Sequence, residues 1–302
     1  MKKSMLAPLA VAVSAFALAG TAHAEDTLKK IKDTGTITEG VRESSGALAF
    51  TLGDGKYTGF HYDVCAHIIA DIQKHLGMAK LETKYQPVTS QNRIPLVQNG
   101  TVDLECGSTT NNAARQKDVA FAPALYIEEV RIAVKANGGI KDIAGLNGKT
   151  VATTTGTTSV QLLRKNKRAA GTDFKELNGK DHSDSFLLLE SGRADAFVMD
   201  GQILAGLISK AKNPADFKIV GEPLSVEPIA IMYRKDDPAF KKVVDDSVRA
   251  MAKSGEVAKL YDKWFMQPIP PANTRVNLPA SDATKAAWAN PTDKPLEEYA
   301  QP

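Results

Sequence analysis

Short apolar runs alternate along this chain with stretches of helical period, and glycines stand at many of the junctions. Apolar runs of about four to six residues bounded by turns are typical of buried strands, and apolar residues at every third or fourth position are typical of amphipathic helices. The alternation predicts an α/β fold with mostly parallel strands. We expect strands at residues 37–41, 81–85, 102–106, 131–134, 150–154, 194–199 and 217–220, and helices at 27–34, 62–76, 93–99, 159–165, 183–191, 203–210 and 238–265.

One unit of this pattern occurs twice. The stretches LVQNGTVDLECG (96–107) and LLESGRADAFVMD (188–200) each contain the end of an apolar-faced helix, a Gly, an Asp and a short apolar strand. Gly100 and Gly192 stand where the C-terminal cap of a helix favours positive φ. The repetition, 92 residues apart, indicates two similarly built lobes rather than one sheet of double size.

The two ends of the chain differ from its middle. Residues 1–24 contain Lys2 and Lys3, a short run rich in Ala, Leu and Val, and then a small-x-small cleavage pattern, as is typical of a secretory signal peptide. The mature chain would then begin at Glu25, and no later segment is apolar enough to span a bilayer. After residue 265 the chain is rich in Pro, Asn and Thr, which predicts an extended wrap or a loosely held tail.

Charge and cysteine content limit the classes of partner. Without the two leader lysines, 36 basic residues stand against 35 acidic ones, so there is no electrostatic case for binding nucleic acid or an anionic membrane. The two cysteines, Cys65 and Cys106, would enter an oxidising compartment. A disulfide and two buried thiols are both compatible with the sequence, because a disulfide needs Cα atoms within about 7 Å.

Four polar clusters occur where a strand or turn leads into a helix, at the edge where open parallel sheets bind ligands. The first is Ser108, Thr110 and Arg115, in ECGSTTNNAARQ (105–116); its alternative is a helix cap with a solvated arginine. The second is Thr158 after the Gly156 turn, in TTTGTTS (153–159). The free N–H groups of a helix start suit a carboxylate or a phosphate, although a simple capping turn fits as well. The absence of a G-x-x-x-x-G-K-[ST] loop disfavours nucleotide.

The third cluster is Arg42, Ser90 and Arg93. Arginine grips a carboxylate bidentately, so two of them at strand ends suit an acidic ligand. The alternative is a salt bridge to Glu43 or Asp63.

The fourth cluster is His182 with Asp200, and Asp200 closes a buried apolar strand. An acid in that place binds an ammonium group, or it caps the following helix near Gln202.

Metal and enzyme chemistry find little support in the sequence. The five histidines show neither H-E-x-x-H nor a Cys/His ligand spacing, and there is no G-x-S-x-G elbow. A covalent mechanism at Cys106 would need a paired histidine, for which only His182 is available. We expect no catalytic residue, no metal and no cofactor.

Four motifs carry a resemblance to a known family: TSQNRIPLVQNGTVDLECGSTTNNAARQ (89–116), TTTGTTS (153–159), KDHSDSFLLLESGRADAFVMD (180–200) and DKWFMQPIPP (262–271). From about residue 28 to residue 278 the chain resembles the periplasmic glutamate/aspartate-binding proteins of bacterial ABC amino-acid importers, in solute-binding protein family 3. The ECGSTTNN block is specific for the branch that binds acidic amino acids. The other motifs fit the wider class that binds polar amino acids.

The resemblance implies a type II periplasmic-binding-protein fold, in which two α/β lobes joined by a two-strand hinge close on the ligand. We expect the hinge crossings near residues 127–130 and 227–233. Lobe 1 would be discontinuous, with residues 25–128 and 231–278, lobe 2 would be residues 129–230, and residues 279–302 would form a tail. The resemblance also implies a monomer in the periplasm that docks on an inner-membrane ABC permease.

Carried over residue by residue, the resemblance gives nine ligand-binding residues for glutamate or aspartate. Arg115, Thr110 and Thr158 would hold the α-carboxylate, Asp200 and Ser108 the α-ammonium, and Arg42, Ser90, Arg93 and His182 the side-chain carboxylate.

Two departures from the family and two alternatives remain. Family members often have Pro-Phe where this chain has Gly46, Ala47 and Leu48, and Gly201 replaces a second acid after Asp200. The replacement of Pro-Phe removes an aromatic side chain that would pack on the ligand, and this affects the preference for glutamate or aspartate. One alternative is an enzyme similar to cyclohexadienyl dehydratases, with Asp200 or Glu105 transferring the proton. The other is a binding protein for a dicarboxylate without an amino group, which Asp200 would repel.

Overall fold

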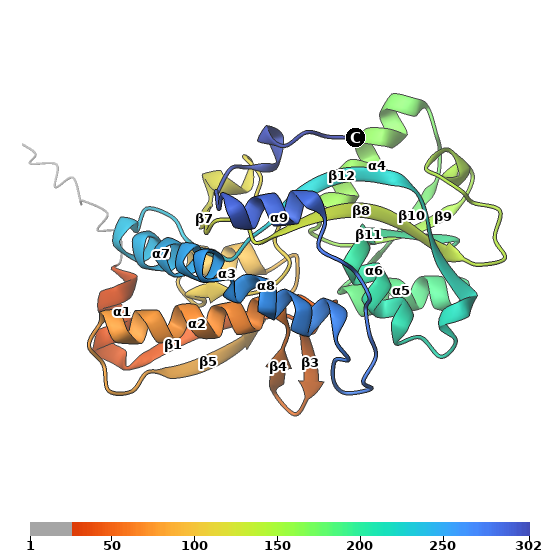
Figure 1. Ribbon diagram of the computed structural model, residues 1–302. Helices are drawn as coiled ribbons and strands as arrows, with labels where there is room; N and C mark the ends of the chain where they lie inside the picture. The colour runs from red at the N-terminus through yellow and green to blue at the C-terminus, as the bar shows by residue number, and fades with distance from the viewer. Residues whose placement is uncertain (1–25) are drawn as a thin grey trace, which may run out of the picture.

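The computed structural model describes residues 26–302 and contains two five-stranded sheets (Figure 1). We call the parts of the molecule built on them the first and second lobes. The first sheet has the order β5-β1-β6-β13-β7 and the second β10-β9-β11-β8-β12. The first contains β1 (Thr36–Val41), β5 (Glu82–Pro87), β6 (Leu104–Glu105), β7 (Val119–Phe121) and β13 (Met232–Arg234). The second contains β8 (Tyr126–Lys135), β9 (Thr150–Thr154), β10 (Lys175–Gly179), β11 (Ala196–Asp200) and β12 (Phe217–Ile229).

Two long strands join the lobes. β8 leaves the first lobe after β7, and β12 returns to it before β13. The two pair antiparallel from Tyr126 opposite Ile229 to Lys135 opposite Phe217, with one irregularity between Val220 and Ser225. The mixed α/β architecture with a two-strand hinge is therefore the fold class expected from the resemblance. The prediction of mostly parallel strands is wrong, because β8 pairs antiparallel with β11 and β12, and β13 pairs antiparallel with β6 and β7. The signal peptide predicted for residues 1–24 lies outside the described residues.

Helices cover both faces of each sheet (Figure 1). In α2 (Phe60–His75), Phe60, Val64, Ile68 and Ile72 recur at every fourth residue and are fully buried, as an apolar helical stripe predicts. The first lobe also holds α1 (Thr27–Thr34), α3 (Arg93–Gln98), α7 (Pro238–Ser254) and α8 (Glu256–Tyr261), and the second holds α4 (Thr158–Ala170), α5 (His182–Glu190) and α6 (Gly201–Ser209).

The single helix predicted at residues 238–265 is wrong. Gly255 adopts φ +77° and ends α7, and the chain continues as α8 and a π-helical turn at Asp262–Met266. Four strands were not predicted, because they are short or weakly apolar: β2 (Ser44–Ser45), β3 (Ala49–Gly53), β4 (Lys56–Thr58) and β10. The strands β7 and β13, which have only three residues each, were not predicted either.

The disulfide Cys65–Cys106 fixes α2 to the end of β6, with Cα atoms 6.2 Å apart. Both cysteines are buried in the first-lobe core. Of the two states that the sequence allowed for these cysteines, the structure contains the bonded one.

The C-terminal segment wraps along the hinge. It forms α9 (Asp282–Ala289), whose Trp288 indole N–H donates to the carbonyl of Leu125 at 2.7 Å. Farther on, the amide of Gln301 donates to the carbonyl of Val226 in β12 at 3.0 Å. The segment therefore contacts the chain beside both hinge strands. Between residues 26 and 302 no helix is long and apolar enough to cross a membrane.

Candidate functional site

Three buried arginines converge on the edge of the first sheet. Arg42 follows β1, Arg93 begins α3, and Arg115 begins a short 3-10 turn, and they are 0%, 2% and 9% exposed. Burial first, and then the charges of Arg115 and Arg42, lower the pKa of Arg93 to about 9, against the opposing charges of Glu105 and Asp200. This mutual influence requires the guanidinium groups to lie near one another.

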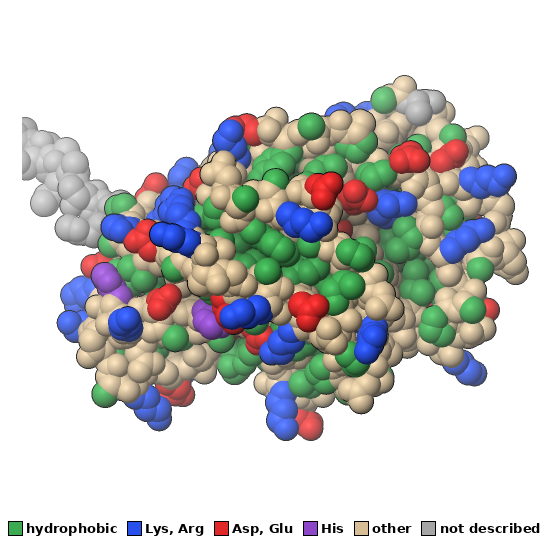
Figure 2. All heavy atoms as spheres, in the orientation of Figure 1, with side chains coloured by type: hydrophobic (Ala, Val, Ile, Leu, Met, Phe, Trp, Pro, Cys, Tyr) green, Lys and Arg blue, Asp and Glu red, His purple; other side chains and the backbone are tan. Residues whose placement is uncertain are grey.

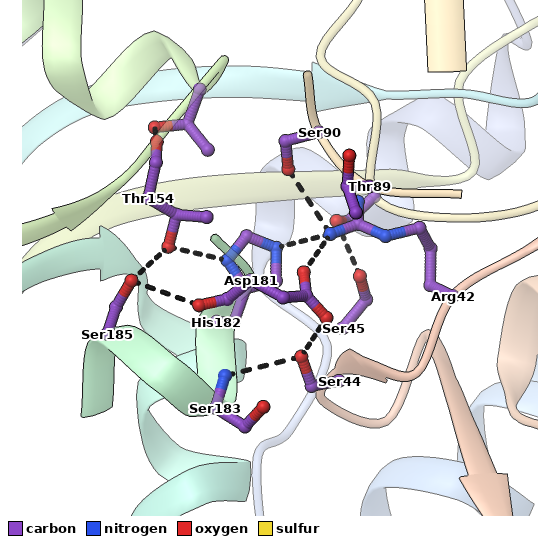
Figure 3. Close-up of polar contacts among 12 residues, drawn as sticks. Arg42, Ser44, Ser45, Thr89, Ser90, Thr154, Asp181, His182, Ser183 and Ser185 are labelled. Atoms are coloured by element: carbon purple, nitrogen blue, oxygen red, sulfur yellow. Dashed lines mark hydrogen bonds and ion pairs between the residues drawn. The ribbon is translucent and has the colours of Figure 1, made fainter. Parts of the chain in front are cut away.

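Arg42 also reaches across to the second lobe (Figure 3). Its Nη2 donates to Asp181 Oδ1 at 2.7 Å and to Ser90 Oγ at 3.2 Å. The other oxygen of Asp181 accepts from Ser44 Oγ at 2.6 Å. The alternative of a salt bridge from Arg42 to Glu43 or Asp63 is wrong, because Asp181 is its partner.

His182 lies next to this ion pair and is neutral. Its Nε2 is 3.1 Å from Arg42 Nη2, and its Nδ1 is 3.0 Å from Thr154 Oγ1. Arginine only donates, so Nε2 must accept and Nδ1 must carry the proton. Burial first, and then the charge of Arg42, lower the pKa of His182 to about 3. The ring thus offers no positive charge to a ligand at neutral pH.

A second group of hydroxyls gathers around a hinge carboxylate. Thr110 Oγ1 and Thr158 Oγ1 both donate to Glu227 Oε2, at 2.6 and 2.8 Å, although Thr110 is in the first lobe and Thr158 begins α4 in the second. Glu227 is 1% exposed on β12. Beside it, Arg115 donates to the carbonyls of Thr110 and Gly156, at 2.8 and 3.3 Å. Arg115 therefore bridges the lobes and is not the solvated arginine of the alternative interpretation.

Asp200 ends β11 and is buried. Its side chain makes no capping hydrogen bond to α6, so the capping alternative fails. Burial, and then the charge of Glu227, raise its pKa to about 7, and Arg93, Arg115 and Arg42 oppose this rise. Asp200 therefore lies near enough to the three arginines for their charges to favour its ionised form. Ser108, the remaining predicted residue, pairs with Ser45 at 3.0 Å.

Several strong donors of this site have no protein acceptor. Nε and Nη1 of both Arg42 and Arg93 are buried and make no hydrogen bond within residues 26–302. A buried guanidinium N–H that lacks an acceptor is costly, and a carboxylate is its natural partner. The site thus combines unsatisfied cationic donors with the nearby acids Asp181, Asp200 and Glu227.

The lobes also touch directly beside the site. The Ala47 N–H donates to Gln202 Oε1 at 3.1 Å, and Gln202 Nε2 donates to the Ser45 carbonyl at 3.3 Å. A Cβ on Gly46 would collide with Gln202 Oε1, and one on Gly206 would stand 3.2 Å from Gly46 Cα. The Gly46-Ala47-Leu48 segment, a departure from the family pattern, is thus the surface on which α6 closes.

Three residues of the site were not predicted from the sequence: Asp181, Gln202 and Glu227. Asp181 directly precedes His182, so the KDHSD motif could have indicated it. Glu227 lies within the predicted hinge crossing at residues 227–233, where it is the one acid among apolar neighbours, and this was the signal that the sequence offered. Gln202 lies at the start of the helix that Asp200 was expected to cap, and no other signal in the sequence marks it.

One further cluster has the spacing of metal ligands. Glu39, Cys65 and Cys106 hold their ligand atoms within 4.8 Å of one another among the described residues. The two sulfurs are bonded to each other, so they offer no thiolates, and thiolate is the form that binds metal.

Comparisons with known proteins agree with this architecture. The family model for bacterial extracellular solute-binding proteins, family 3, matches residues 37–267. The chain is 45% identical to the glutamate/aspartate import solute-binding protein of Escherichia coli (strain K12), over 98% of this chain and 99% of that protein. It is 48% identical to the L-glutamate/L-aspartate-binding protein of Pseudomonas aeruginosa, over 90% of each.

A solved structure gives the same fold. The ancestral amino acid-binding protein AncCDT-1, described as a precursor of cyclohexadienyl dehydratase, superposes with a TM-score of 0.68 at 29% identity. The match covers 79% of this chain and 99% of that one.

Proposed function

Because the chain belongs to family 3 of the bacterial extracellular solute-binding proteins, we propose that it captures L-glutamate or L-aspartate between its lobes for an ABC importer. The observation that carries this proposal is the convergence of Arg42, Arg93 and Arg115 with Asp200 at the junction of the lobes. An amino-acid dicarboxylate has two anionic groups and one cation. The site offers the complementary charges.

The roles divide by location. Arg115, with the hydroxyls of Thr110 and Thr158 and the start of α4, binds the α-carboxylate. Asp200, with Ser108, binds the α-ammonium. The side-chain carboxylate takes the free N–H groups of Arg42 and Arg93, flanked by Ser90 and by neutral His182.

Glu227 and Asp181 tune this site. In the structure, Thr110 and Thr158 donate to Glu227, so a bound α-carboxylate competes with Glu227 for the two hydroxyls. Asp181 holds one end of Arg42 and leaves Nε and Nη1 of that side chain for the ligand. The lobes close because the ligand bridges groups that belong to both.

Capture and delivery, not catalysis, is the activity. The relatives at 45% and 48% identity are named as solute-binding proteins. The likeness to a dehydratase precursor is lower, at 29%, and is to a protein that is itself named as amino acid-binding. The dehydratase alternative is therefore not favoured. When the protein is incubated with prephenate or with arogenate, we expect neither compound to be converted to a product.

The location and assembly follow from the same function. A signal peptide at residues 1–24 sends the chain to the periplasm, where a monomer delivers the amino acid to an inner-membrane permease, with no use for nucleic acid. Residues 25–128 and 231–278 form the first lobe, 129–230 the second, and 279–302 the tail. The long pairing of β8 with β12 near residues 128 and 230 supports these limits.

A calorimetric titration of the mature chain with glutamate, aspartate, glutamine and arginine tests the proposal. We expect saturable heat with the two acidic amino acids at micromolar concentration or below, about −8 kcal/mol or stronger. Arg93→Gln should weaken binding at least about 100-fold, because a charge-assisted pair is lost. The control is Arg164→Gln, since Arg164 is half exposed on α4 and pairs only with Glu176 among the described residues. Binding of neutral or cationic amino acids but not of the acidic pair would refute the proposal.

A further inference from the structure

A separate cavity lies beside the hinge. It measures about 210 Å³ and is walled by the hinge strand β8, the start of α6, the end of α8 and the segment that leads into α9. None of the nine predicted ligand-binding residues lines it. In the orientation of Figure 1 the labels β8, α6, α8 and α9 surround this region, and Figure 2 shows apolar side chains gathered over the middle of the same face.

Glu128 supplies a buried carboxyl to this cavity. The residue is 2% exposed and lines the wall. Its Oε1 accepts the backbone N–H of Glu129 at 2.9 Å, but its Oε2 is buried without a hydrogen-bond partner among residues 26–302. A buried carboxyl oxygen in this state is costly unless a proton or a cation satisfies it.

The rest of the wall is mainly apolar and aromatic, with one ion pair and the polar residues Gln202, Ser281 and Thr284. Tyr126, Ile127, Ile219, Tyr261, Leu278 and Pro279 contribute apolar surface. The charged pair is Glu129 with Arg131, 3.3 Å apart, and its two side chains are 46% and 27% exposed. Arg131 also donates to the Gly221 carbonyl at 2.6 Å. Because Glu129 is paired with Arg131, Glu128 is the acid without an ion-pair partner that a ligand in the cavity would meet, and Arg131 Nε is a buried donor that has no acceptor among residues 26–302.

We propose that this cavity is a second ligand site, for a small organic ammonium ion with an apolar body. The ammonium group lies against Glu128 Oε2, and the apolar body lies against the tyrosine and aliphatic wall, where aromatic faces also attract a cation. A volume of about 210 Å³ accepts an alkyl group of a few carbons. An alkyl group of four carbons, about as large as a small apolar amino-acid side chain, fits this cavity.

Binding at this site releases a proton. Burial, followed by the charge of Asp200, raises the pKa of Glu128 well above its ordinary value, although hydrogen bonds from the backbone of Glu129 and Gln202 oppose the rise, and Glu227 adds to it. The other titratable groups around the carboxyl are the buried hydroxyls of Tyr126 and Tyr261 and the Glu129–Arg131 pair. The ammonium ion replaces the carboxyl proton, which leaves to solvent, so binding strengthens as pH rises.

The test uses isobutylammonium as the probe and isobutanol as its uncharged analogue of equal shape. Both are titrated into the full mature chain saturated with glutamate, so that Asp200 is already engaged. Calorimetry at pH 6 and pH 7, in two buffers with different ionisation heats, reads affinity and proton release together. We expect one saturable site for isobutylammonium, tighter at pH 7 than at pH 6 by up to about tenfold with up to one proton released, and at least about tenfold weaker binding of isobutanol.

Two variants locate the site independently. Glu128→Gln removes the charge and should abolish proton release and weaken probe binding at least tenfold. Ala205→Leu fills the cavity from α6 while leaving Glu128 intact, and it should weaken binding equally. The control is Glu129→Gln, whose carboxylate is half exposed and which should bind the probe within about threefold of the parent.

Three results would overturn the proposal: equal affinity for isobutanol, affinity that does not change with pH, or unchanged affinity in both Glu128→Gln and Ala205→Leu. A glutamate titration of every variant reports folding and the amino-acid cleft separately. Failure of glutamate to bind any protein would count against the proposed function alone, since the probe can also be titrated into the unliganded chain.

Discussion

Arg42 of the first lobe and Asp181 of the second form an ion pair 2.7 Å long between the lobes, and the Arg42 side chain is completely buried. Burial alone would raise the pKa of Asp181, but the charge of Arg42, with His182 and hydrogen bonds from Ser44 and Arg42, lowers it to about 2. The pair therefore stays ionised throughout the physiological range. It joins two segments that are 139 residues apart in the sequence.

The pair forms only when the lobes meet, so we expect Asp181→Asn to weaken glutamate binding about tenfold, or roughly 1.4 kcal/mol. Calorimetry gives the affinity. The matched control is Asp184→Asn, one turn along α5 and exposed, which should leave affinity unchanged. Tighter binding by Asp181→Asn would mean that Asp181 competes with the ligand for Arg42.

Gly156 allows the lobes to approach. It adopts φ +82°, and a Cβ there would stand 2.7 Å from Gln91 Cα and from the Ser90 carbonyl oxygen, in the opposite lobe. We expect Gly156→Ala to weaken glutamate binding at least about 100-fold, near 2.7 kcal/mol, because closure is blocked. Small-angle scattering should show that glutamate no longer compacts the variant.

Gly148→Ala is the control for backbone strain. Gly148 adopts φ +72°, but a Cβ there would meet no atom within 4 Å, so this variant carries the strain without the collision. A similar loss of affinity in both variants would show that strain, not lobe contact, is responsible.

Glutamate binding should depend on pH through Asp200. Without ligand its pKa is about 7, and the ligand ammonium favours the ionised form. Binding at pH 6 therefore releases a proton, and affinity rises with pH until about 7. Calorimetry at pH 6 in two buffers of different ionisation heat measures the release. Identical heats in the two buffers would exclude proton release from Asp200.

Glu39 should make the folded chain less stable as pH rises from about 5 to about 8. Burial raises its pKa to about 8 from the 4.5 of an exposed glutamate. Between these values the folded state holds the proton and the unfolded state does not, so the free energy of unfolding falls as pH rises, by about 1.4 kcal/mol per unit.

In Glu39→Gln this contribution is absent, so its stability relative to the parent should grow from pH 5 to pH 8. Urea unfolding at four pH values measures the difference. Glu43→Gln, at an exposed position nearby, is the control, and its difference from the parent should stay constant. A constant difference for Glu39→Gln as well would contradict the prediction.

The disulfide should stabilise the fold substantially. Cys65 and Cys106 are 41 residues apart, and closing a loop of that size in the unfolded chain is worth about 4 kcal/mol. Removing both cysteines, as Cys65→Ala with Cys106→Ala, should lower the urea midpoint accordingly. Reductant should lower the parent's midpoint and leave that of the double variant unchanged. An unaffected parent would show that the bond contributes little.

Local patterns predicted local structure well. The apolar stripe of α2 and the glycine caps at Gly100 and Gly192, with φ of +74° and +75°, depend on residues close in sequence. By contrast, β13 pairs with β6 and β7, more than 110 residues earlier, through three residues only. Pairing at that range depends on the tertiary fold, which no local pattern encodes.

The same division applies to the site. Arg42, Arg93 and Arg115 each follow a recognisable strand or turn, so their convergence could be predicted from the resemblance and the edge rule for parallel sheets. Asp181 and Glu227 acquire their partners only across the lobe junction. Their contacts depend on how far the lobes close, and the sequence carries no measure of that distance.

The attachment of both chain ends affects how this protein could be made into an optical sensor. The N–H of Thr27 donates to Asp237 in the first lobe at 2.9 Å, and Gln301 is held against β12 at the hinge. Fluorescent domains fused to the two termini would therefore move little relative to each other when the lobes swing. A fluorescent domain inserted at the exposed turn after α4, near Gly171, would move with the second lobe. With a second fluorescent domain at the amino end, closure of the lobes on the ligand would change the energy transfer between the two domains.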